Sequence, residues 1–234
     1  MSKIYVKRYS IIDRLMHWSV ALGFVLLSIT GFVIFFQGSA SLLNSNIGSF
    51  IRILHRIGAV LFIAAPILYL LFSKKRWAWS EAFKWDKSDI GWLKAAPKHY
   101  FIGGDGMPPQ GKYNTGQKLY YLFALIGGLL LAVSGLALWF DWFAGKTNFI
   151  VLIIHDLSAV ILVAFFFVHL YLTSIHPRER KSFEAMATGM MEEEYAKHHH
   201  ERWYNEVKET DLVVIEENKN SSKIKPITSN NLSH

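Results

Sequence analysis

Residues 148–174 read N-F-I-V-L-I-I-H-D-L-S-A-V-I-L-V-A-F-F-F-V-H-L-Y-L-T-S and place two histidines in a long apolar run. Apart from His155, Asp156 and His169, the side chains are mostly apolar or small. A helix needs about 20 such residues to cross a bilayer. The stretch therefore predicts a membrane-spanning helix over residues 149–174 that carries two imidazoles.

The two histidines of this helix share one face. They are 169 − 155 = 14 residues apart, so at roughly 100° per residue they lie within about 40° of each other around the axis. At about 1.5 Å per residue they are on the order of 21 Å apart along it. Two stacked haems, each taking one axial ligand from this helix, would need that arrangement. The alternative is that each histidine only hydrogen-bonds to a neighbouring helix, as intramembrane polar groups commonly do.

Composition favours a membrane protein. The chain has 234 residues, of which 52% are hydrophobic, and its formal net charge of +7 is interleaved with four long apolar runs. This pattern argues against a nucleic-acid-binding protein. The chain has no cysteine, which excludes disulfides, cysteine-ligated iron–sulfur clusters and covalently attached c-type haem. Any haem must be bound non-covalently, and iron–sulfur chemistry must belong to a partner.

The apolar runs predict an all-α membrane protein, a bundle of four transmembrane helices in one domain over residues 1–204. A cleavable signal peptide is the alternative for the first run, because Gly38 and Ala40 resemble a cleavage site. That run is too long for a signal peptide, however, and it opens with His17 and Trp18. The expected helices cover residues 15–36, 53–72, 119–140 and 149–174.

Three polar segments complete the expected architecture. The tryptophan-rich stretch 73–117 predicts an amphipathic loop helix at the membrane interface. The charged segment 177–204 predicts a C-terminal helix, and the polar composition of residues 205–234 predicts a disordered tail. Nearly all Lys and Arg lie in these segments and at the N-terminus, so the positive-inside rule puts both termini, the loop helix and the tail in the cytoplasm.

This orientation sorts four histidines into two levels of the membrane. His17 and His169 fall on the inner side, and His55 and His155 fall on the outer side. Neutral imidazole is a common axial ligand of haem iron, so each pair is a candidate haem site. Gly31 lies 14 residues beyond His17, at the outer level, where a larger side chain would obstruct a porphyrin; close helix packing explains a glycine there equally well.

At these residues the chain resembles a known family. The segments R-Y-S-I-I-D-R-L-M-H-W, R-I-L-H-R-I-G, G-K-Y-N-T-G-Q-K and H-H-H-E-R-W-Y resemble the cytochrome b (gamma) subunit of respiratory, membrane-bound formate dehydrogenase. The resemblance runs from roughly Val6 to Val207 and includes the order and spacing of the four helices. It departs at Glu201, where the family usually has proline.

The resemblance implies a set of cofactors and site residues. It implies that His17, His55, His155 and His169 bind two b haems, in the same pairs that membrane depth gives. It also implies that Asn114 and Gly116 contact menaquinone or another quinone near the inner haem, with His169 close by. Gln117, in the same loop, offers a further polar group to a quinone, although N-T-G-Q alone reads most simply as a turn and a helix start.

The resemblance further implies a place in a complex of the bacterial cytoplasmic (inner) membrane. Formate would be oxidised in a molybdenum- or tungsten-containing catalytic alpha subunit and the electrons passed through an iron–sulfur beta subunit, so this chain would hold no catalytic residue for formate. The heterotrimer could assemble into a higher oligomer. The alternatives are the cytochrome b subunit of a hydrogenase or thiosulfate reductase, and, in another class, a haem-free membrane anchor or small transporter.

Overall fold

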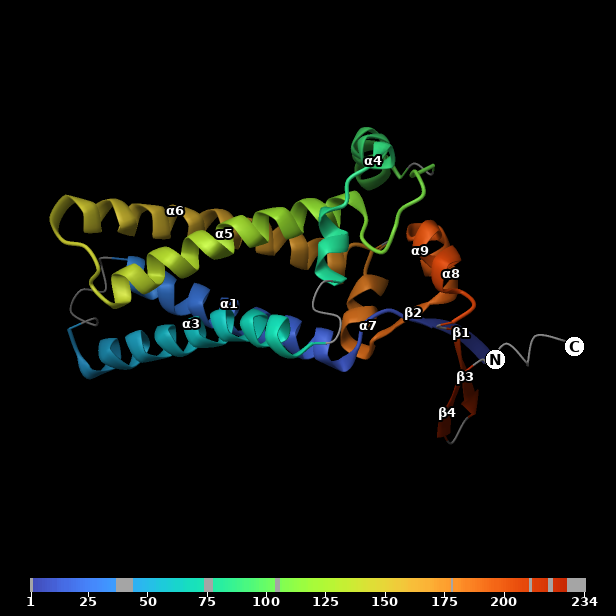
Figure 1. Cartoon of the computed structure of the whole chain (residues 1–234), viewed down its shortest axis with the longest axis horizontal. Helices are drawn as coiled ribbons and strands as arrows, with labels where there is room; N and C mark the ends of the chain where they lie inside the picture. Colours follow the sequence, from blue (N-terminus) through green and yellow to red (C-terminus); the bar gives the residue numbers. More distant parts are fainter. Residues whose placement is uncertain are drawn as a thin grey trace, which may run out of the picture. The chain divides into compact units, whose positions relative to one another are not determined.

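The computed structural model describes residues 2–36, 44–73, 78–103, 106–177, 179–210, 212–218 and 221–226 (Figure 1). The chain is mostly helical and divides into two compact units. We call the first the bundle unit; it comprises Ile12–Arg76 and Leu122–Val168. We call the second the sheet unit; it comprises Met1–Ile11, Trp77–Tyr121 and His169–His234.

Four long helices are apolar enough to cross a membrane, as the sequence predicts. Their N-termini lie between 15 − 11 = 4 and 53 − 46 = 7 residues before the expected starts, because polar residues that precede each apolar run join the first turns. Ser45, for example, accepts a hydrogen bond from Gly48 N and caps the second helix. The helices are α1 (Ile11–Phe35), α3 (Asn46–Phe72), α5 (Thr115–Trp139) and α6 (Gly145–Leu170), and a π-helical turn, η4 (Tyr171–Ile175), continues α6.

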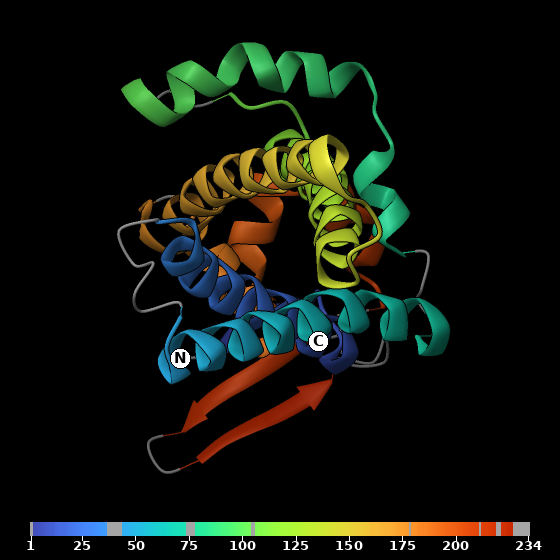
Figure 2. The same cartoon turned by 90° about the vertical axis from the view of Figure 1, so that its left-hand side faces the viewer.

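Small residues allow the helices of the bundle unit to approach closely (Figure 2). A Cβ added at Gly23 of α1 would lie 2.9 Å from the carbonyl oxygen of Gly58 in α3, and one added at Gly127 of α5 would lie 2.8 Å from Leu162 of α6. In lipid, such van der Waals packing replaces the hydrophobic effect as the force between helices. The bundle is therefore held by close contact, with large apolar side chains such as Phe32 left exposed on its surface.

The sheet unit contains a four-stranded antiparallel sheet of order β2-β1-β3-β4. Its N-terminal strand pairs with two strands from the C-terminal third of the chain, with Val6 opposite both Met191 and Leu212. The strands are β1 (Ser2–Lys7), β2 (Met190–Glu192), β3 (Leu212–Asn218) and β4 (Ser221–Pro226). Pairing across the length of the chain thus joins the two terminal segments.

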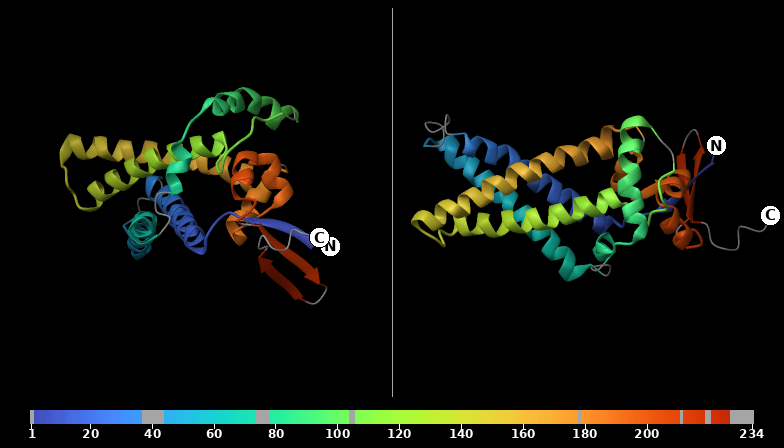
Figure 3. Two further views of the ribbon diagram at one scale, coloured as in Figure 1. Left: turned by 45° about the vertical axis from the view of Figure 1, so that its right-hand side comes forward. Right: turned by 90° about the horizontal axis from the view of Figure 1, so that it is seen from above.

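Short helices accompany this sheet and the loop before α5, and two of them pack against β1 and β2 (Figure 3). Val6 and Met191 are almost fully buried and pack in one core with Tyr195, Trp203 and Ala185. The elements are η2 (Ala78–Phe83), α4 (Lys87–Pro97), the π-helical η3 (Lys98–Ile102), α7 (Lys181–Thr188), α8 (Glu193–His199) and α9 (Glu201–Val207).

The structure departs from the sequence expectations in the polar segments. Helix α4 lies in the stretch where a loop helix was expected, and the C-terminal segment forms three short helices rather than one. The sheet was not predicted, and β3 and β4 lie inside the tail, residues 205–234, for which we expected disorder. Strand β1 pairs with segments that are distant in the sequence, so this pairing leaves no local periodicity. Strands β3 and β4 form a local hairpin inside the tail. Gly38 and Ala40 lie outside the described residues.

Candidate functional site

Within the bundle unit, the structure brings two of the four predicted ligands together. His55 comes from α3 and His155 from α6, and their ring centroids are 6.4 Å apart with an interplanar angle of 66°. Both rings lie in membrane-spanning helices, where a polar group is costly unless it is paired. The two imidazoles therefore need partners, and each has one on a neighbouring helix.

The partner of His55 is the hydroxyl of Thr30 on α1. Thr30 Oγ1 lies 2.9 Å from His55 Nδ1 and also 2.6 Å from the carbonyl oxygen of Leu26, one turn earlier in its own helix. A threonine hydroxyl has one proton, and the carbonyl can only accept it. Thr30 Oγ1 therefore accepts the Nδ1–H of His55, and the Nε2 lone pair of this ring is left for another ligand.

His155 has the same environment on the other pair of helices. Ser134 Oγ of α5 lies 2.9 Å from His155 Nδ1 and donates to the carbonyl oxygen of Leu130 at 2.5 Å. Because the single hydroxyl proton of Ser134 goes to this carbonyl, Ser134 Oγ accepts the Nδ1–H of His155. In both rings Nε2 therefore carries the lone pair. A metal binds a histidine in this tautomer when a neighbouring group accepts the hydrogen bond from Nδ1–H.

A glycine follows each hydroxyl residue and lies against the same ring. A Cβ at Gly31 would lie 3.3 Å from His55 Cε1, and one at Gly135 would lie 3.1 Å from His155 Cε1. Any larger residue would press on the imidazole. The pairs Thr30–Gly31 and Ser134–Gly135 therefore form a repeated arrangement, in which one residue fixes the ring and the next leaves space beside it.

This geometry fits a haem iron held between two imidazoles. A metal about 2 Å from each nitrogen, the distance typical of zinc–imidazole bonds, separates the two ring centres by roughly 6 Å once the ring radii are added, close to the observed 6.4 Å. Within the described ranges, no group of three or more His, Cys, Asp or Glu side chains could hold a metal ion. Axial ligation of haem by two histidines is therefore the metal chemistry that this geometry fits best.

The other two predicted ligands, His17 and His169, fall in different units. His17, in the bundle unit, lies half-buried on α1 with its ring 5.1 Å from that of Trp18. His169, in the sheet unit, lies at the end of α6 and stacks on Tyr120 at 4.3 Å and 15°. The prediction that His17 and His169 share a haem stays a prediction.

The three predicted quinone residues form the start of α5. Asn114 Oδ1 accepts a hydrogen bond from Gln117 N at 2.9 Å, and Gln117 Oε1 accepts one from Asn114 N at 3.1 Å. This reciprocal pair is a capping box. The interpretation of N-T-G-Q as a turn and a helix start is therefore correct for the side chains of Asn114 and Gln117. If these residues also bind a quinone, they do so in addition to capping the helix.

Asn114 keeps one functional group that capping does not use. Its Oδ1 serves the cap, but across the described residues its Nδ2 makes no hydrogen bond, and the side chain lines a small cavity of about 20 Å³. Gly116 has a packing role, because a Cβ there would lie 2.8 Å from Trp92 of α4. The amide Nδ2 of Asn114 is thus the donor that this loop could offer to a carbonyl oxygen.

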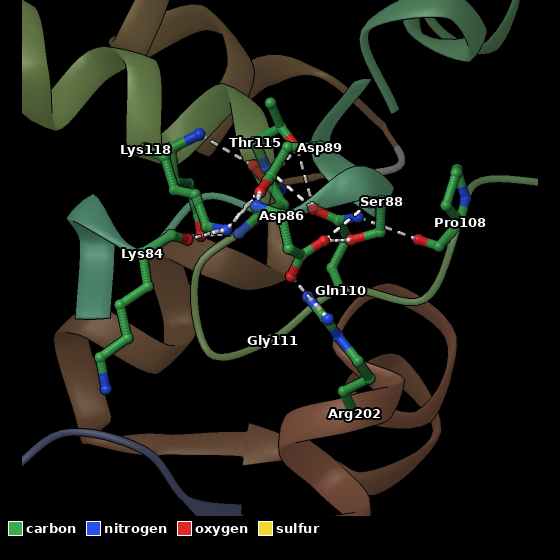
Figure 4. A network of polar contacts seen from close by, with 12 residues as sticks. Lys84, Asp86, Ser88, Asp89, Pro108, Gln110, Gly111, Thr115, Lys118 and Arg202 are labelled. Atoms are coloured by element: carbon green, nitrogen blue, oxygen red, sulfur yellow. Dashed lines mark hydrogen bonds and ion pairs between the residues drawn. The ribbon is translucent and has the colours of Figure 1, made fainter. Parts of the chain in front are cut away.

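A buried ion pair holds α4 against the first turn of α5 (Figure 4). Lys118 Nζ lies 2.9 Å from both carboxylate oxygens of Asp89 and also donates to the carbonyl oxygen of Lys84. Thr115 Oγ1 donates to Asp89 Oδ1 at 2.7 Å. Burial alone would raise the pKa of Asp89, but the hydrogen bonds from Thr115 and Lys118 outweigh it and lower the pKa.

The C-terminal helices hold the loop before Asn114. His200 is fully buried, and its Nδ1 lies 2.9 Å from the carbonyl oxygen of Gly111; burial lowers its pKa well below the usual value, so the ring is neutral. Arg202 N donates to the carbonyl oxygen of Gln110, and Arg202 Nη1 pairs with Asp86 at 2.7 Å. The segment docks on the loop with Glu201 in place of the family's proline.

Sequence reasoning missed the groups that support the predicted site residues. Thr30 and Ser134 were not singled out; each directly precedes a glycine in a membrane helix, but the sequence does not show which histidine either residue faces. Asp89 could not have been found in the same way, because its partner Lys118 is distant in sequence and both read as ordinary surface charges. Supporting residues become visible only when the helices are placed side by side.

Comparisons with known proteins identify the relatives of the chain. The prokaryotic cytochrome b561 family matches residues 8–189. The cytochrome b556(fdo) subunit of formate dehydrogenase from Escherichia coli K12 is 31% identical over 212 residues, which cover 88% of this chain and 94% of the relative. The nitrate-inducible cytochrome b556(Fdn) subunit of the same strain is 29% identical (90% and 94%), and the Haemophilus influenzae subunit is 27% identical (88% and 87%).

Asp89→Asn tests the buried ion pair. Removing one partner of such a pair leaves the other charge buried, which costs about 3–5 kcal/mol. We expect this loss in the free energy of unfolding, measured by tryptophan fluorescence in detergent and denaturant. The pKa of Asp89 is lower in the folded state than in the unfolded state. The stability that the wild-type pair contributes is therefore fully present above the unfolded-state pKa of 3.8, and it is lost as pH falls through the folded-state pKa.

Asp86→Asn is the matched control. It removes the exposed partner of Arg202, and asparagine caps α4 as well as aspartate does, so a loss of at most about 1 kcal/mol is expected. Equal stability of the two variants would contradict a structural role for the buried pair.

Proposed function

Because the chain belongs to the prokaryotic cytochrome b561 family, we propose that it is the cytochrome b subunit of a respiratory formate dehydrogenase and reduces a quinone, menaquinone in the first instance. Relatives that bear this name match most of the chain at 27–31% identity. The four membrane-spanning helices supply the required architecture. The observation that carries the proposal is the His55–His155 pair, because two fixed imidazoles at 6.4 Å suit an axially ligated haem.

Two b haems are assigned to four histidines of the chain. His55 and His155 hold the outer haem, and His17 and His169 hold the inner one. When bound, haem b supplies one-electron transfer across the membrane. The residues around His55 and His155 fix the tautomer, leave room for a porphyrin beside each ring and exclude water with their apolar neighbours. Moving each electron inward against the membrane potential costs about 2.3 kcal/mol per 100 mV.

The quinone is assigned to the cytoplasmic side, at the start of α5. Asn114 Nδ2 donates to a carbonyl oxygen of the quinone, while Asn114 Oδ1 and Gln117 keep the first turn of the helix in place. Gly116 keeps Trp92 close to the same turn. The stacked rings of His169 and Tyr120 belong to the same unit of the structure. The loop thus combines one available donor with a rigid frame.

Partner subunits supply the rest of the reaction. An iron–sulfur beta subunit passes electrons to the outer haem, and a molybdenum- or tungsten-containing alpha subunit oxidises formate. The excess of Lys and Arg in the polar segments supports cytoplasmic termini and a location in the bacterial inner membrane. This chain takes no part in the oxidation of formate itself.

His55→Ala tests the haem assignment. We expect loss of the outer haem with retention of the inner one, because the predicted inner ligands are other residues. Low-temperature absorption spectra with redox titration of purified membranes measure both haems. Retention of two haems at wild-type potentials would remove His55 from the site.

Thr30→Val and Ser134→Ala test the tautomer argument. Each removes a hydroxyl that accepts an Nδ1–H, and loss of a group that orients a metal-binding histidine weakens metal binding by about 10- to 100-fold. We expect partial loss of the outer haem on washing and a shift of its potential, whereas Thr30→Ser should behave as wild type. Unchanged haem content and potential in both hydroxyl-free variants would show that the hydroxyls only pack.

Asn114→Asp separates quinone binding from helix capping. Aspartate caps a helix as well as asparagine does but lacks the Nδ2 donor. The free energy of unfolding should therefore stay unchanged, while reoxidation of the haems by quinone becomes slower. Loss of one hydrogen bond costs about 0.5–1.5 kcal/mol, or roughly 2- to 13-fold in affinity. Asn114→Ser caps without adding charge and should show the same defect. Stopped-flow reoxidation of formate-reduced membranes measures it, and wild-type rates in both variants would leave Asn114 with capping alone.

A further inference from the structure

A buried carboxylate lies near the proposed quinone site in the sheet unit. Glu179, between η4 and α7, is 6% exposed. Its Oε1 lies 3.8 Å from His99 Nε2 and 3.7 Å from His199 Nδ1, and its Oε2 accepts a hydrogen bond from Tyr195 OH at 3.0 Å. A carboxylate and two imidazoles are thus gathered around one point.

These groups form a series that runs from the surface inward. His198 is exposed, and its ring centroid lies 4.9 Å from that of His199. Exposure of the side chains falls from 15% at His199 to 8% at Glu179 and 4% at His99. The ring centroids of His199 and His99 are 6.4 Å apart, with the Glu179 carboxylate contacting both. The members of the series therefore lie close to one another.

The small cavity beside Asn114 is lined by all four of these residues, His198, His199, Glu179 and His99. Its volume of about 20 Å³ is enough for one water molecule, which needs roughly 10–15 Å³ and two to four polar partners. The lining groups that could hold that water are His99, Glu179, His198, His199, Gln110 and Asn114. The cavity thus joins the carboxylate cluster to the side chain proposed to bind the quinone.

We propose that His198, His199, Glu179 and His99 form a proton relay that carries cytoplasmic protons to the quinone bound at Asn114. The proposal rests on the proposed quinone-reducing function and adds the residues that supply its protons. Buried polar clusters can also serve packing alone. A relay differs from packing because it must change its protonation state in each turnover.

The relay accounts for the protons in the reaction. Oxidation of formate to carbon dioxide in the partner releases two electrons and one proton on the outer side. Reduction of the quinone takes up these two electrons and two protons from the cytoplasm, one O–H bond forming at each carbonyl oxygen. Glu179 donates a proton to the quinone through His99 and the cavity water. It then takes up a proton from His199, which is reprotonated from the cytoplasm through the exposed His198.

The groups around the carboxylate suit this task. Burial raises the pKa of Tyr100 and of Tyr195, and the charge of Glu179 raises both further, so the two tyrosines stay protonated and act only as donors. The titratable and charged groups near Glu179 are His99 and Tyr100 of η3, Tyr195 and His199 of α8, and Arg8, whose charge acts on Tyr195. The carboxylate and the histidines are therefore the groups left to carry protons.

Glu179→Gln tests the relay in the intact complex with its partner subunits. Glutamine keeps the shape of the side chain but cannot exchange a proton. We expect formate-driven haem reduction and the affinity for a quinone-site inhibitor to stay as in wild type. Quinol formation should slow by about 100-fold, the lower end of the range of general acid–base effects, with an altered pH profile of kcat and a larger solvent isotope effect. Glu179→Asp should restore part of the rate.

Glu184→Gln is the matched control, because Glu184 is an exposed glutamate on α7. The relay would be overturned if Glu179→Gln still bound the inhibitor and matched this control in its rate of quinol formation and its pH profile. The proposed function would then remain. A wild-type complex that binds no inhibitor and forms no quinol would instead overturn the proposed function. His199→Gln interrupts the same series at another member, and the same comparison applies to it if Glu179→Gln fails to assemble.

Discussion

A polar side chain inside a membrane helix is costly unless it is paired, and this constraint explains the surroundings of His55 and His155. The Nδ1–H of His55 is accepted by Thr30, and that of His155 by Ser134, while each hydroxyl proton goes to a carbonyl of its own helix. The tautomer is therefore set by the backbone of the neighbouring helix. The remaining nitrogen of each ring, Nε2, is the one proposed to bind the haem iron.

The same requirement explains where small residues occur. Gly31 and Gly135 directly follow the two hydroxyl residues and face the rings, so α1 and α5 can approach the helices that carry the histidines. In the sheet unit a different device fixes the loop before α5. The buried Asp89–Lys118 pair and the capping box of Asn114 and Gln117 hold that loop rigid. One unit orients two histidines, and the other holds a polar loop in place.

Local sequence patterns were sufficient for the four membrane-spanning helices. The four spans were predicted because apolar length alone defines them, and the structure has His55 and His155 close together, although their role as ligands stays a prediction. The sheet could not be predicted, because Val6 pairs with Met191 and Leu212 across most of the chain. Glu179 and its histidines come from three separate segments for the same reason. Neither Thr30 nor Ser134 stands out in sequence until its histidine is placed beside it.

The central claim is that four histidines of this chain hold two b haems, each iron between two imidazoles. The most direct measurement is the haem content per chain in the purified complex, combined with electron paramagnetic resonance of the oxidised iron. We expect two non-covalent b haems per chain, both low-spin with two nitrogen ligands. One haem per chain, or a high-spin signal from either iron in the intact complex, would contradict the claim.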